Sequence, residues 1–466
     1  MAAGLCVRPA AIVLRMTVQV RFWGTRGSLP TPRHTTLRHG GNTSCVELRP
    51  PDGTLIVLDC GTGAYELGRA LTATGQRVRG HLFISHMHWD HINGFPFFAP
   101  LFVPGNEWDV YAPSGLGECL EDTLAGQMEY PYFPVTLEQL AATIRYHDLA
   151  EGELALGAVR VVTQYLNHPA LTLGYRFEVG GVSAVYATDH EPNSPHQLWP
   201  TDEPLTRGRS RVHREDERHI TFVEGADLLI HDAQYTLAEY PEKTAWGHTP
   251  AELATDFALA AGVKRLALFH HDPSRNDDAV DALVAACRER IAARGGEMRV
   301  FAAAEGDTIV LEPSRTTDTA TPRAARDPAE RRSSDPHATT IVVVDDEASI
   351  LETVIATLEP EGFRLVCASD GETALDVVRA ERPDLVLLDW GLPGRDGLDV
   401  CRTLRRDPDP KLASVPIVVL TGRTGAEDMR EGFRAGVTDY MTKPFKATHL
   451  RSRVRAWLLR ARAVDT

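Results

Sequence analysis

Short apolar runs, separated by polar and glycine-containing stretches, recur along the first two thirds of the chain. Runs of three to five residues with branched and aromatic side chains predict buried β-strands. The clearest are Val18–Phe22, Cys45–Leu48, Thr54–Leu58, His81–Ser85, Leu228–Ile230 and Arg265–Phe269. Segments of helical character lie among them, at Ala64–Leu71, Pro250–Ala260 and Asp277–Ala293. Strands interleaved with helices predict layered α/β packing.

Two longer strand candidates, Leu171–Val179 and Ser183–Thr188, are separated by Gly180-Gly181. Two consecutive glycines suit a hairpin turn that needs positive φ. The pattern therefore predicts an antiparallel pair at this point of the chain.

The last third of the chain has a more regular pattern, in which strand and helix alternate five times. The predicted strands are Ile341–Val344, Leu365–Cys367, Leu385–Leu388, Ile417–Leu420 and Thr438–Met441. They are mostly apolar, as strands covered on both faces must be. We therefore expect a small doubly wound sheet.

Residues 313–338 contain no Val, Ile, Leu or Phe. Such a stretch cannot bury enough apolar surface to offset its ordering entropy, so it is interpreted as a flexible linker. It divides the chain into domains at 16–312 and 339–466. Residues 1–15 are interpreted as a non-native or disordered extension, with Met16 as the natural start.

Composition narrows the class of protein. The length of 466 residues predicts two or three domains, and 43% hydrophobic residues are typical of a globular chain. A net charge of −15 argues against extended nucleic-acid binding. Seven scattered cysteines favour a reducing compartment, and no apolar run is long enough for a membrane helix. We expect a cytoplasmic protein without membrane contact.

One stretch, His86-Met87-His88-Trp89-Asp90-His91, offers four metal-ligand side chains directly after a predicted strand. Imidazole and carboxylate are preferred ligands of Zn²⁺ and its neighbours. His86 and His88 can reach one ion, and Asp90 and His91 a second. The alternative is a polar surface loop with chance histidines.

Further ligand candidates lie at other predicted strand ends. They are His168, Asp189 and His270. His168 could complete a set with His86 and His88, Asp189 could bridge both ions, and His270 could join Asp90 and His91. For each alone, a hydrogen-bonded structural residue is the alternative. His270 is followed by His271, whose side chain is expected to point elsewhere.

The H-x-H-x-D-H pattern resembles the metallo-β-lactamase fold of hydrolases. Phe22-Trp23-Gly24-Thr25-Arg26-Gly27-Ser28-Leu29-Pro30 and Gly247-His248-Thr249-Pro250 are similar to the phosphodiesterase branch, which includes ribonuclease Z and cyclic-nucleotide phosphodiesterases. The resemblance implies a four-layer αβ/βα sandwich with a dinuclear site at one edge. It also implies that Asp59 orients the histidine loop without coordinating metal.

The resemblance implies hydrolysis by water whose pKa two cations lower, with zinc expected and manganese or iron as alternatives. Asp90 would align the nucleophile while binding its metal. His248 precedes Thr249-Pro250-Ala251-Glu252, which predicts a capped helix start that favours an anionic phosphate. His248 would bind that phosphate or protonate the leaving oxygen, and a surface histidine is the alternative.

Aromatic runs at 95–98 and 130–134 could form substrate walls or simply pack in the core. We expect a small phosphodiester such as a cyclic nucleotide as substrate. A lactonase or esterase of the same fold remains an alternative, as does a non-catalytic metal-binding sensor or docking module.

Acidic residues end two strands of the predicted C-terminal sheet. Asp345 and Asp346 follow the first strand and Asp389 the third, while Thr421 ends the fourth and Lys443 follows the fifth. Carboxylates at the carboxyl edge of a parallel sheet suit Mg²⁺. The combination resembles a two-component receiver domain with a flavodoxin-like (βα)5 fold.

The receiver resemblance implies a role for each of these residues. A sensor histidine kinase would phosphorylate Asp389, and Mg²⁺ would bind Asp345, Asp346, Asp389 and the Gly391 carbonyl. Lys443 and Thr421 would contact the phosphoryl group, and Tyr440 would then turn inward. The whole chain is interpreted as a response regulator whose output domain, a phosphodiesterase, comes first; a homodimer is left open.

Overall fold

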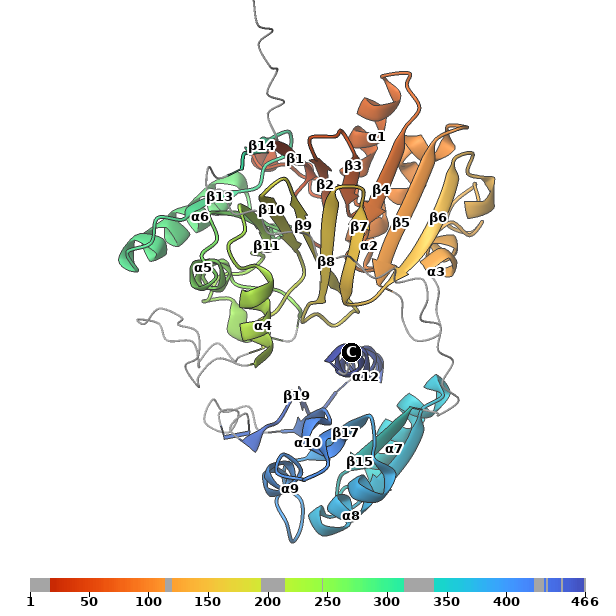
Figure 1. Cartoon of the computed structure of the whole chain (residues 1–466), viewed down its shortest axis with the longest axis vertical. Coiled ribbons are helices and arrows are strands. Elements are labelled where there is room, and N and C mark those ends of the chain that lie inside the picture. Colours follow the sequence, from red (N-terminus) through yellow and green to blue (C-terminus); the bar gives the residue numbers. More distant parts are fainter. Residues whose placement is uncertain are drawn as a thin grey trace, which may run out of the picture.

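The computed structural model describes residues 17–113, 120–193, 214–244, 246–313, 339–422, 431–432, 435–445 and 447–464. Two large sheets with their helices form the first part of the chain, and a smaller sheet forms the second (Figure 1). The predicted extension 1–15 and nearly all of the predicted linker 313–338 lie outside the described residues. Within these residues, no helix combines the length and apolar character needed to cross a membrane.

The first sheet has seven strands in the order β14-β1-β2-β3-β4-β5-β6. Their bounds are β1 (Val18–Gly24), β2 (Cys45–Arg49), β3 (Leu55–Leu58), β4 (Arg79–Phe83), β5 (Glu107–Pro113), β6 (Thr143–Leu149) and β14 (Thr308–Leu311). Along β3 the side chains alternate between two apolar clusters, since Ile56 packs between the sheets and Val57 packs under helices. Because both faces of the sheet are covered by apolar clusters, consecutive residues of these strands are apolar, and the strands appear in the sequence as continuous apolar runs.

The second sheet also has seven strands, in the order β13-β12-β11-β10-β9-β8-β7. They are β7 (Gly152–Leu156), β8 (Val159–Tyr165), β9 (Leu173–Val179), β10 (Val182–Ala187), β11 (Leu228–Asp232), β12 (Arg265–Phe269) and β13 (Arg299–Ala302). The predicted hairpin is confirmed, because β9 and β10 pair antiparallel with Val179 opposite Val182. Gly180 and Gly181 both have positive φ, 59° and 77°.

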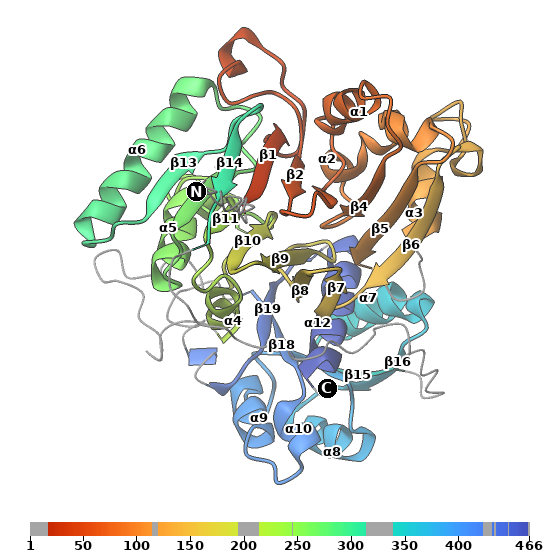
Figure 2. The ribbon, with the colours of Figure 1, turned by 45° about the horizontal axis from the view of Figure 1, so that its top comes forward.

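The two sheets face each other across one hydrophobic cluster, and helices cover their outer faces (Figure 2). Helices α1 (Ala64–Thr72), α2 (Trp89–Ile92) and α3 (Leu120–Gln127) pack on the first sheet. Helices α4 (Arg214–Phe222), α5 (Ala251–Ala260) and α6 (Asp277–Ala293) pack on the second. The predicted four-layer αβ/βα sandwich is therefore confirmed.

The third sheet is parallel throughout, with strand order β16-β15-β17-β18-β19. Its strands are β15 (Thr340–Val344), β16 (Arg364–Ala368), β17 (Leu385–Asp389), β18 (Ile417–Thr421) and β19 (Asp439–Thr442). Helices α7 (Ala348–Leu358) and α12 (Ala447–Val464) cover one face, whereas α8 (Gly371–Glu381), α9 (Gly397–Leu404) and the short α10 (Pro410–Ser414) lie on the other. The predicted doubly wound, flavodoxin-like fold is confirmed.

Candidate metal centre

The loop between β4 and α2 places the four motif side chains around one point. His88 is the N-cap residue of α2, and its carbonyl accepts the His91 N–H at 3.0 Å. Asp90 and His91 lie in the single turn of α2 and are buried, while His88 is exposed. The site therefore opens to solvent beside His88.

One group of possible ligands consists of His86, His88, His168 and Asp189, whose donor atoms all lie within 4.8 Å of one another. His168 Nε2 is 3.1 Å from His88 Nδ1, and His86 Nε2 is 3.6 Å from Asp189 Oδ2. His168 donates through Nδ1 to the Gly247 carbonyl at 2.9 Å, which leaves Nε2 for a cation. Gly247 has φ 89°, and a Cβ there would lie 2.1 Å from His168 Nδ1.

A second group consists of Asp90, His91 and His270. Asp90 Oδ2 lies 3.0 Å from His270 Nε2 and 3.2 Å from His91 Nε2. Asp189 Oδ1 is 3.3 Å from His91 and 3.2 Å from His270, while its other oxygen faces the first group. The structure thus brings together all seven predicted ligands, with Asp189 between the two groups.

Two of the candidate ligand atoms are buried nitrogens without hydrogen-bond partners in the described part of the chain, which cations could coordinate. His86 Nε2 and His91 Nε2 are buried, and neither has a hydrogen-bond partner among the described residues. Buried polar atoms without partners are rare in folded proteins and call for an explanation. Two divalent cations held by imidazole and carboxylate ligands would provide it.

The pKa values of the candidate ligands also favour cation binding. Burial lowers the pKa of His86 and of His168 well below the usual value, so both imidazoles are neutral, as metal binding requires. Burial opposes ionisation of Asp90 and Asp189, yet the surrounding histidines hold the pKa of both carboxyls well below the usual value. Burial also opposes the charge on His91, but Asp90 and Asp189 raise the pKa of His91 well above its usual value. A cation could replace that proton.

Asp59 lies behind the ligand groups, fully buried, and its carboxylate accepts four hydrogen bonds. Oδ2 accepts from His91 Nδ1 at 2.7 Å, from the Tyr186 hydroxyl at 2.6 Å and from the Ser85 hydroxyl at 2.9 Å. Oδ1 accepts from the Ser85 N–H at 2.6 Å. The bond to His91 Nδ1 directs Nε2 of that ring towards Asp90 and Asp189.

Replacement of Asp59 by asparagine is expected to weaken divalent-cation affinity by roughly 10- to 100-fold, because the His91 ring loses its charged acceptor. Equilibrium dialysis against a zinc buffer measures this affinity. Asp52→Asn, in the exposed turn before β3, is the matched control. Unchanged affinity in a folded Asp59→Asn protein would contradict the orienting role.

Backbone strain is concentrated at this centre. Five non-glycine residues of the described chain have positive φ, and four of them lie here: Ser28 (61°), Asp59 (58°), Asp189 (52°) and His270 (61°). Left-handed backbone at such residues costs free energy and tends to occur at functional sites. Ser28 uses this conformation to donate its N–H to Asp90 Oδ2 at 2.7 Å.

His248 lies beside both ligand groups but pairs with a residue that the sequence analysis did not select. Its Nδ1 donates to Asp232 Oδ2 at 2.7 Å, and the Asp232 side chain is fully buried at the end of β11. Burial alone would lower the pKa of His248, but Asp232 outweighs it and, with Asp189 and Asp90, raises the pKa to about 9. The ring lies 5.0 Å from that of His270.

The predicted capping box after His248 is wrong. The Thr249 hydroxyl donates to the His190 carbonyl, and Glu252 accepts the Leu237 N–H at 3.1 Å. Helix α5 begins at Ala251 with no side-chain cap. Tertiary partners have thus displaced the local hydrogen bonds that the sequence favours, and His248 is oriented by Asp232.

The adjacent histidines at the end of β12 diverge. His270 donates through Nδ1 to Gln234 Oε1 at 2.8 Å and turns Nε2 towards Asp90. His271 Nε2 donates to the Ala303 carbonyl at 2.9 Å, and burial lowers its pKa to about 3. Gln234 was also missed by the sequence analysis, since nothing in its neighbourhood marks it before the chain folds.

The two predicted aromatic walls are divided between core and surface. Phe95 and Phe98 are fully buried in the cluster between the first sheet and its helices, so two of the three aromatic rings of the first run are core. Phe97, Tyr130 and Tyr132 are exposed by 55%, 85% and 74%, and the Phe97 ring packs edge-on against Phe133. Trp89, which follows His88 at the open side of the site, is 76% exposed.

The C-terminal sheet gathers its predicted residues at one edge as well. Lys443 Nζ lies 2.5 Å from Asp389 Oδ1 and 2.6 Å from Asp345 Oδ2. The Gly391 N–H donates to Asp389 Oδ2 at 2.6 Å. Asp346, which follows Asp345 in the sequence, is exposed. Thr421 is buried at the end of β18; Tyr440 is buried too, with its ring 6.4 Å from that of Trp390.

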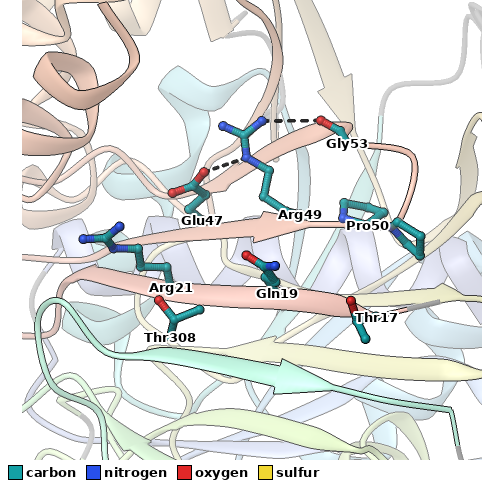
Figure 3. A pocket seen from close by; sticks show the side chains of 9 residues that line it. Thr17, Gln19, Arg21, Glu47, Arg49, Pro50, Gly53 and Thr308 are labelled. Atoms are coloured by element: carbon teal, nitrogen blue, oxygen red, sulfur yellow. Dashed lines mark hydrogen bonds and ion pairs between the residues drawn. The ribbon is translucent and has the colours of Figure 1, made fainter. Parts of the chain in front are cut away.

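A separate hollow of about 430 Å³ lies on the outer strands of the first sheet (Figure 3). It is lined by Thr17, Gln19, Arg21, Glu47, Arg49, Pro50, Pro51, Gly53 and Thr308. Arg49 Nε donates to Glu47 Oε1 at 2.6 Å, so these two charges satisfy each other. None of the candidate ligands lines this hollow.

Two family models match the chain. Residues 54–271 match the beta-lactamase superfamily domain, and residues 341–455 match the response regulator receiver domain. The chain therefore joins a β-lactamase-superfamily domain to a C-terminal response-regulator receiver domain. As a receiver, the second domain implies a histidine kinase as phosphodonor.

Among curated proteins, the DNA-binding response regulators MtrA of Mycolicibacterium paratuberculosis and Mycobacterium leprae are each 50% identical over 120 residues, 26% of this chain. The chain spans about half, 51%, of those proteins. Among solved structures, the metallo-beta-lactamase fold protein YhfI of Bacillus subtilis is 18% identical, with TM-score 0.45, over 64% of this chain and 100% of its own. The short form of human tRNase Z is 20% identical, with TM-score 0.43, over 64% and 99%.

Proposed function

We propose that the N-terminal domain is a metal-dependent phosphodiesterase and that phosphorylation of Asp389 controls it. The observation that carries the proposal is the juxtaposition of two ligand groups with the His248–Asp232 pair. The ligands proposed for the two cations are His86, His88, Asp90, His91, His168, Asp189 and His270, with zinc as the expected ion. A degenerate sensor would not need this complete set.

When bound, the two cations would supply a water of lowered pKa and Lewis-acid stabilisation of charge on phosphorus oxygens. Asp90 would align that water while it remains a ligand. His248 is positioned as the general acid: its Nδ1 is held by Asp232, so Nε2 is the atom that can give a proton to the leaving oxygen. The Asp232 carboxylate raises the pKa of His248, which favours the protonated ring that a general acid needs.

We infer a small phosphodiester, such as a cyclic nucleotide, as the substrate. Trp89, next to His88 at the open side of the loop, is exposed and offers a face on which a base could stack. The net charge of −15 does not favour a long polyanion. The DNA-binding function named for MtrA belongs to a protein of which this chain matches only about half.

The deciding experiment is hydrolysis of bis-p-nitrophenyl phosphate by metal-replete protein, with a p-nitrophenyl ester beside it. Metal-dependent cleavage of the diester supports the phosphodiesterase. Cleavage of the ester alone would instead assign the domain as a lactonase or esterase. No turnover by protein shown to hold two cations would leave a metal-binding sensor or docking module.

For the receiver, we propose that Asp389 accepts the phosphoryl group and that Asp345, Asp346 and Asp389, with the Gly391 carbonyl, hold Mg²⁺. Lys443 already lies against Asp345 and Asp389, where it would pair with a phosphoryl oxygen. Thr421 and Tyr440 would respond as the switch pair.

Replacement of Asp389 by asparagine is expected to abolish phosphorylation by acetyl phosphate and any change in rate that follows it, while basal diester hydrolysis stays within about twofold, because Asp389 belongs to the other domain. Phosphate-affinity gel electrophoresis and parallel rate assays measure both. Asp384→Asn, at the opposite end of β17, is the control. A variant that still responds to acetyl phosphate would contradict the assignment.

A further inference from the structure

A partly buried hydrogen bond joins the receiver to the first domain next to the candidate metal centre. Arg453 of α12 donates through Nη1 to Asn167 Oδ1 at 2.5 Å. Asn167 directly precedes His168 and is 7% exposed, and the Arg453 side chain is 12% exposed. Figures 1 and 2 both show α12 on the side of the receiver that faces β7 and β8.

On the hydrolase side, Asn167 is connected to the loops that carry the site. Its Nδ2 donates to the Glu191 carbonyl at 2.9 Å, and its own carbonyl accepts the Glu191 N–H at 2.7 Å. The Glu191 carboxylate in turn accepts the Gly247 N–H at 2.7 Å. Asn167 therefore ties together the segments that hold His168, Asp189 and His248, and a shift of Asn167 would reach all three.

On the receiver side, Arg453 is held by Asp439, whose Oδ2 accepts from Arg453 Nη2 at 2.6 Å and from Trp457 Nε1 at 2.7 Å. Asp439 is the first residue of β19, and Lys443 follows the last. Lys443 contacts Asp389 at 2.5 Å. A four-residue strand thus separates the group that contacts the phosphorylation site from the group that holds Arg453.

We propose that the Arg453–Asn167 hydrogen bond couples the state of Asp389 to the candidate metal centre. A phosphoryl group on Asp389 would add its oxygens between Asp389 and Lys443, which are now in contact, and so shift Lys443 and β19 and move Asp439 and Arg453 relative to Asn167. This inference rests on the proposed function, since it specifies how phosphorylation of the receiver would alter the hydrolase site. The coupling itself is a physical link between two domains and can be measured without turnover.

The test follows amide hydrogen exchange in the full-length protein, with and without Mg²⁺ and beryllofluoride, which mimics a phosphoryl group on aspartate. The segment followed is 166–172, in which the Leu166 N–H is bonded to the Thr172 carbonyl. In the wild-type protein, beryllofluoride is expected to change exchange in this segment on the order of tenfold, the effect of one charge-assisted hydrogen bond. Arg453→Ala is expected to remove that response.

Arg455→Ala is the matched control, because Arg455 lies on the same helix but pairs with Glu361 inside the receiver at 2.8 Å. It should respond to beryllofluoride as the wild type does. Asn167→Ala breaks the same bond from the other domain, so the conclusion does not depend on how Arg453→Ala folds. Coupling is reciprocal, so Asn167→Ala should also shift the beryllofluoride concentration that half-saturates the receiver.

A wild-type protein whose 166–172 exchange ignores beryllofluoride would overturn the inference, as would a response that persists in both Arg453→Ala and Asn167→Ala. Rates with bis-p-nitrophenyl phosphate separate this failure from that of the proposed function. Hydrolysis without coupling refutes the coupling alone. Coupling without hydrolysis refutes only the phosphodiesterase.

Discussion

Asp90→Ala is expected to lower kcat/KM for a phosphodiester on the order of 10³-fold and to remove roughly one of two bound cations. Asp90 Oδ2 lies 2.7 Å from the Ser28 N–H, 3.0 Å from His270 and 3.2 Å from His91. Asp90 is the only carboxylate in the group that it forms with His91 and His270. Without it, the shared carboxylate of Asp189 would be the only anion facing that cation. The substitution also leaves the Ser28 N–H without its acceptor.

Metal content measured by mass spectrometry, together with steady-state diester hydrolysis, tests this expectation. Asp278→Ala is the matched control, because Asp278 is an aspartate of α6 whose side chain is 91% exposed and pairs with Arg38. Full activity in Asp90→Ala with both cations retained would show that the second ligand group is not a catalytic metal site.

His248→Ala is expected to lower kcat by roughly 10²- to 10⁴-fold for a substrate whose leaving group is an alkoxide, the usual contribution of a general acid. The loss should be much smaller for bis-p-nitrophenyl phosphate, because p-nitrophenolate leaves without needing a proton. A phosphate-binding role predicts a different pattern, namely a raised KM with both substrates. The comparison therefore distinguishes the two roles that the sequence left open for His248.

Asp232→Asn should reproduce part of the His248→Ala loss with the alkoxide substrate, since Asp232 acts only by positioning the His248 ring. His147→Ala is the control: His147 also pairs with an aspartate, Asp109, at 2.9 Å, but lies on β6 away from the ligand groups. Equal losses for both leaving groups in His248→Ala would argue against proton donation.

The candidate site could be read from the sequence wherever its residues are close together in the chain or end a recognisable strand. The six residues from His86 to His91 follow an apolar strand, so their convergence is a local property. Asp189 and His270 each follow a strand that the apolar pattern of the sequence predicted. Asp232 has the same signal, a carboxylate ending β11, but the predicted strand stopped two residues short, at Ile230.

Other parts of the fold could not be read in this way. Strands β6 and β7 have exposed positions and mixed polarity, so their apolar pattern is weak. Phe95 and Phe97 stand two residues apart in one aromatic run, yet one is fully buried and the other is 55% exposed. The path of the chain over the first sheet decides that difference, and sequence periodicity does not contain it.

By itself, the sequence determined the two folds, the ligand loop and the acidic edge of the receiver, because each depends on local periodicity or on side chains at strand ends. Only the tertiary structure decided which partners those side chains meet. Thr249 and Glu252 form hydrogen bonds to other segments in place of a local capping box. His248 pairs with Asp232, and Asn167 accepts a hydrogen bond from Arg453, 286 residues further along the chain. Contacts between distant segments follow from how the layers pack, and that packing depends on the whole chain at once.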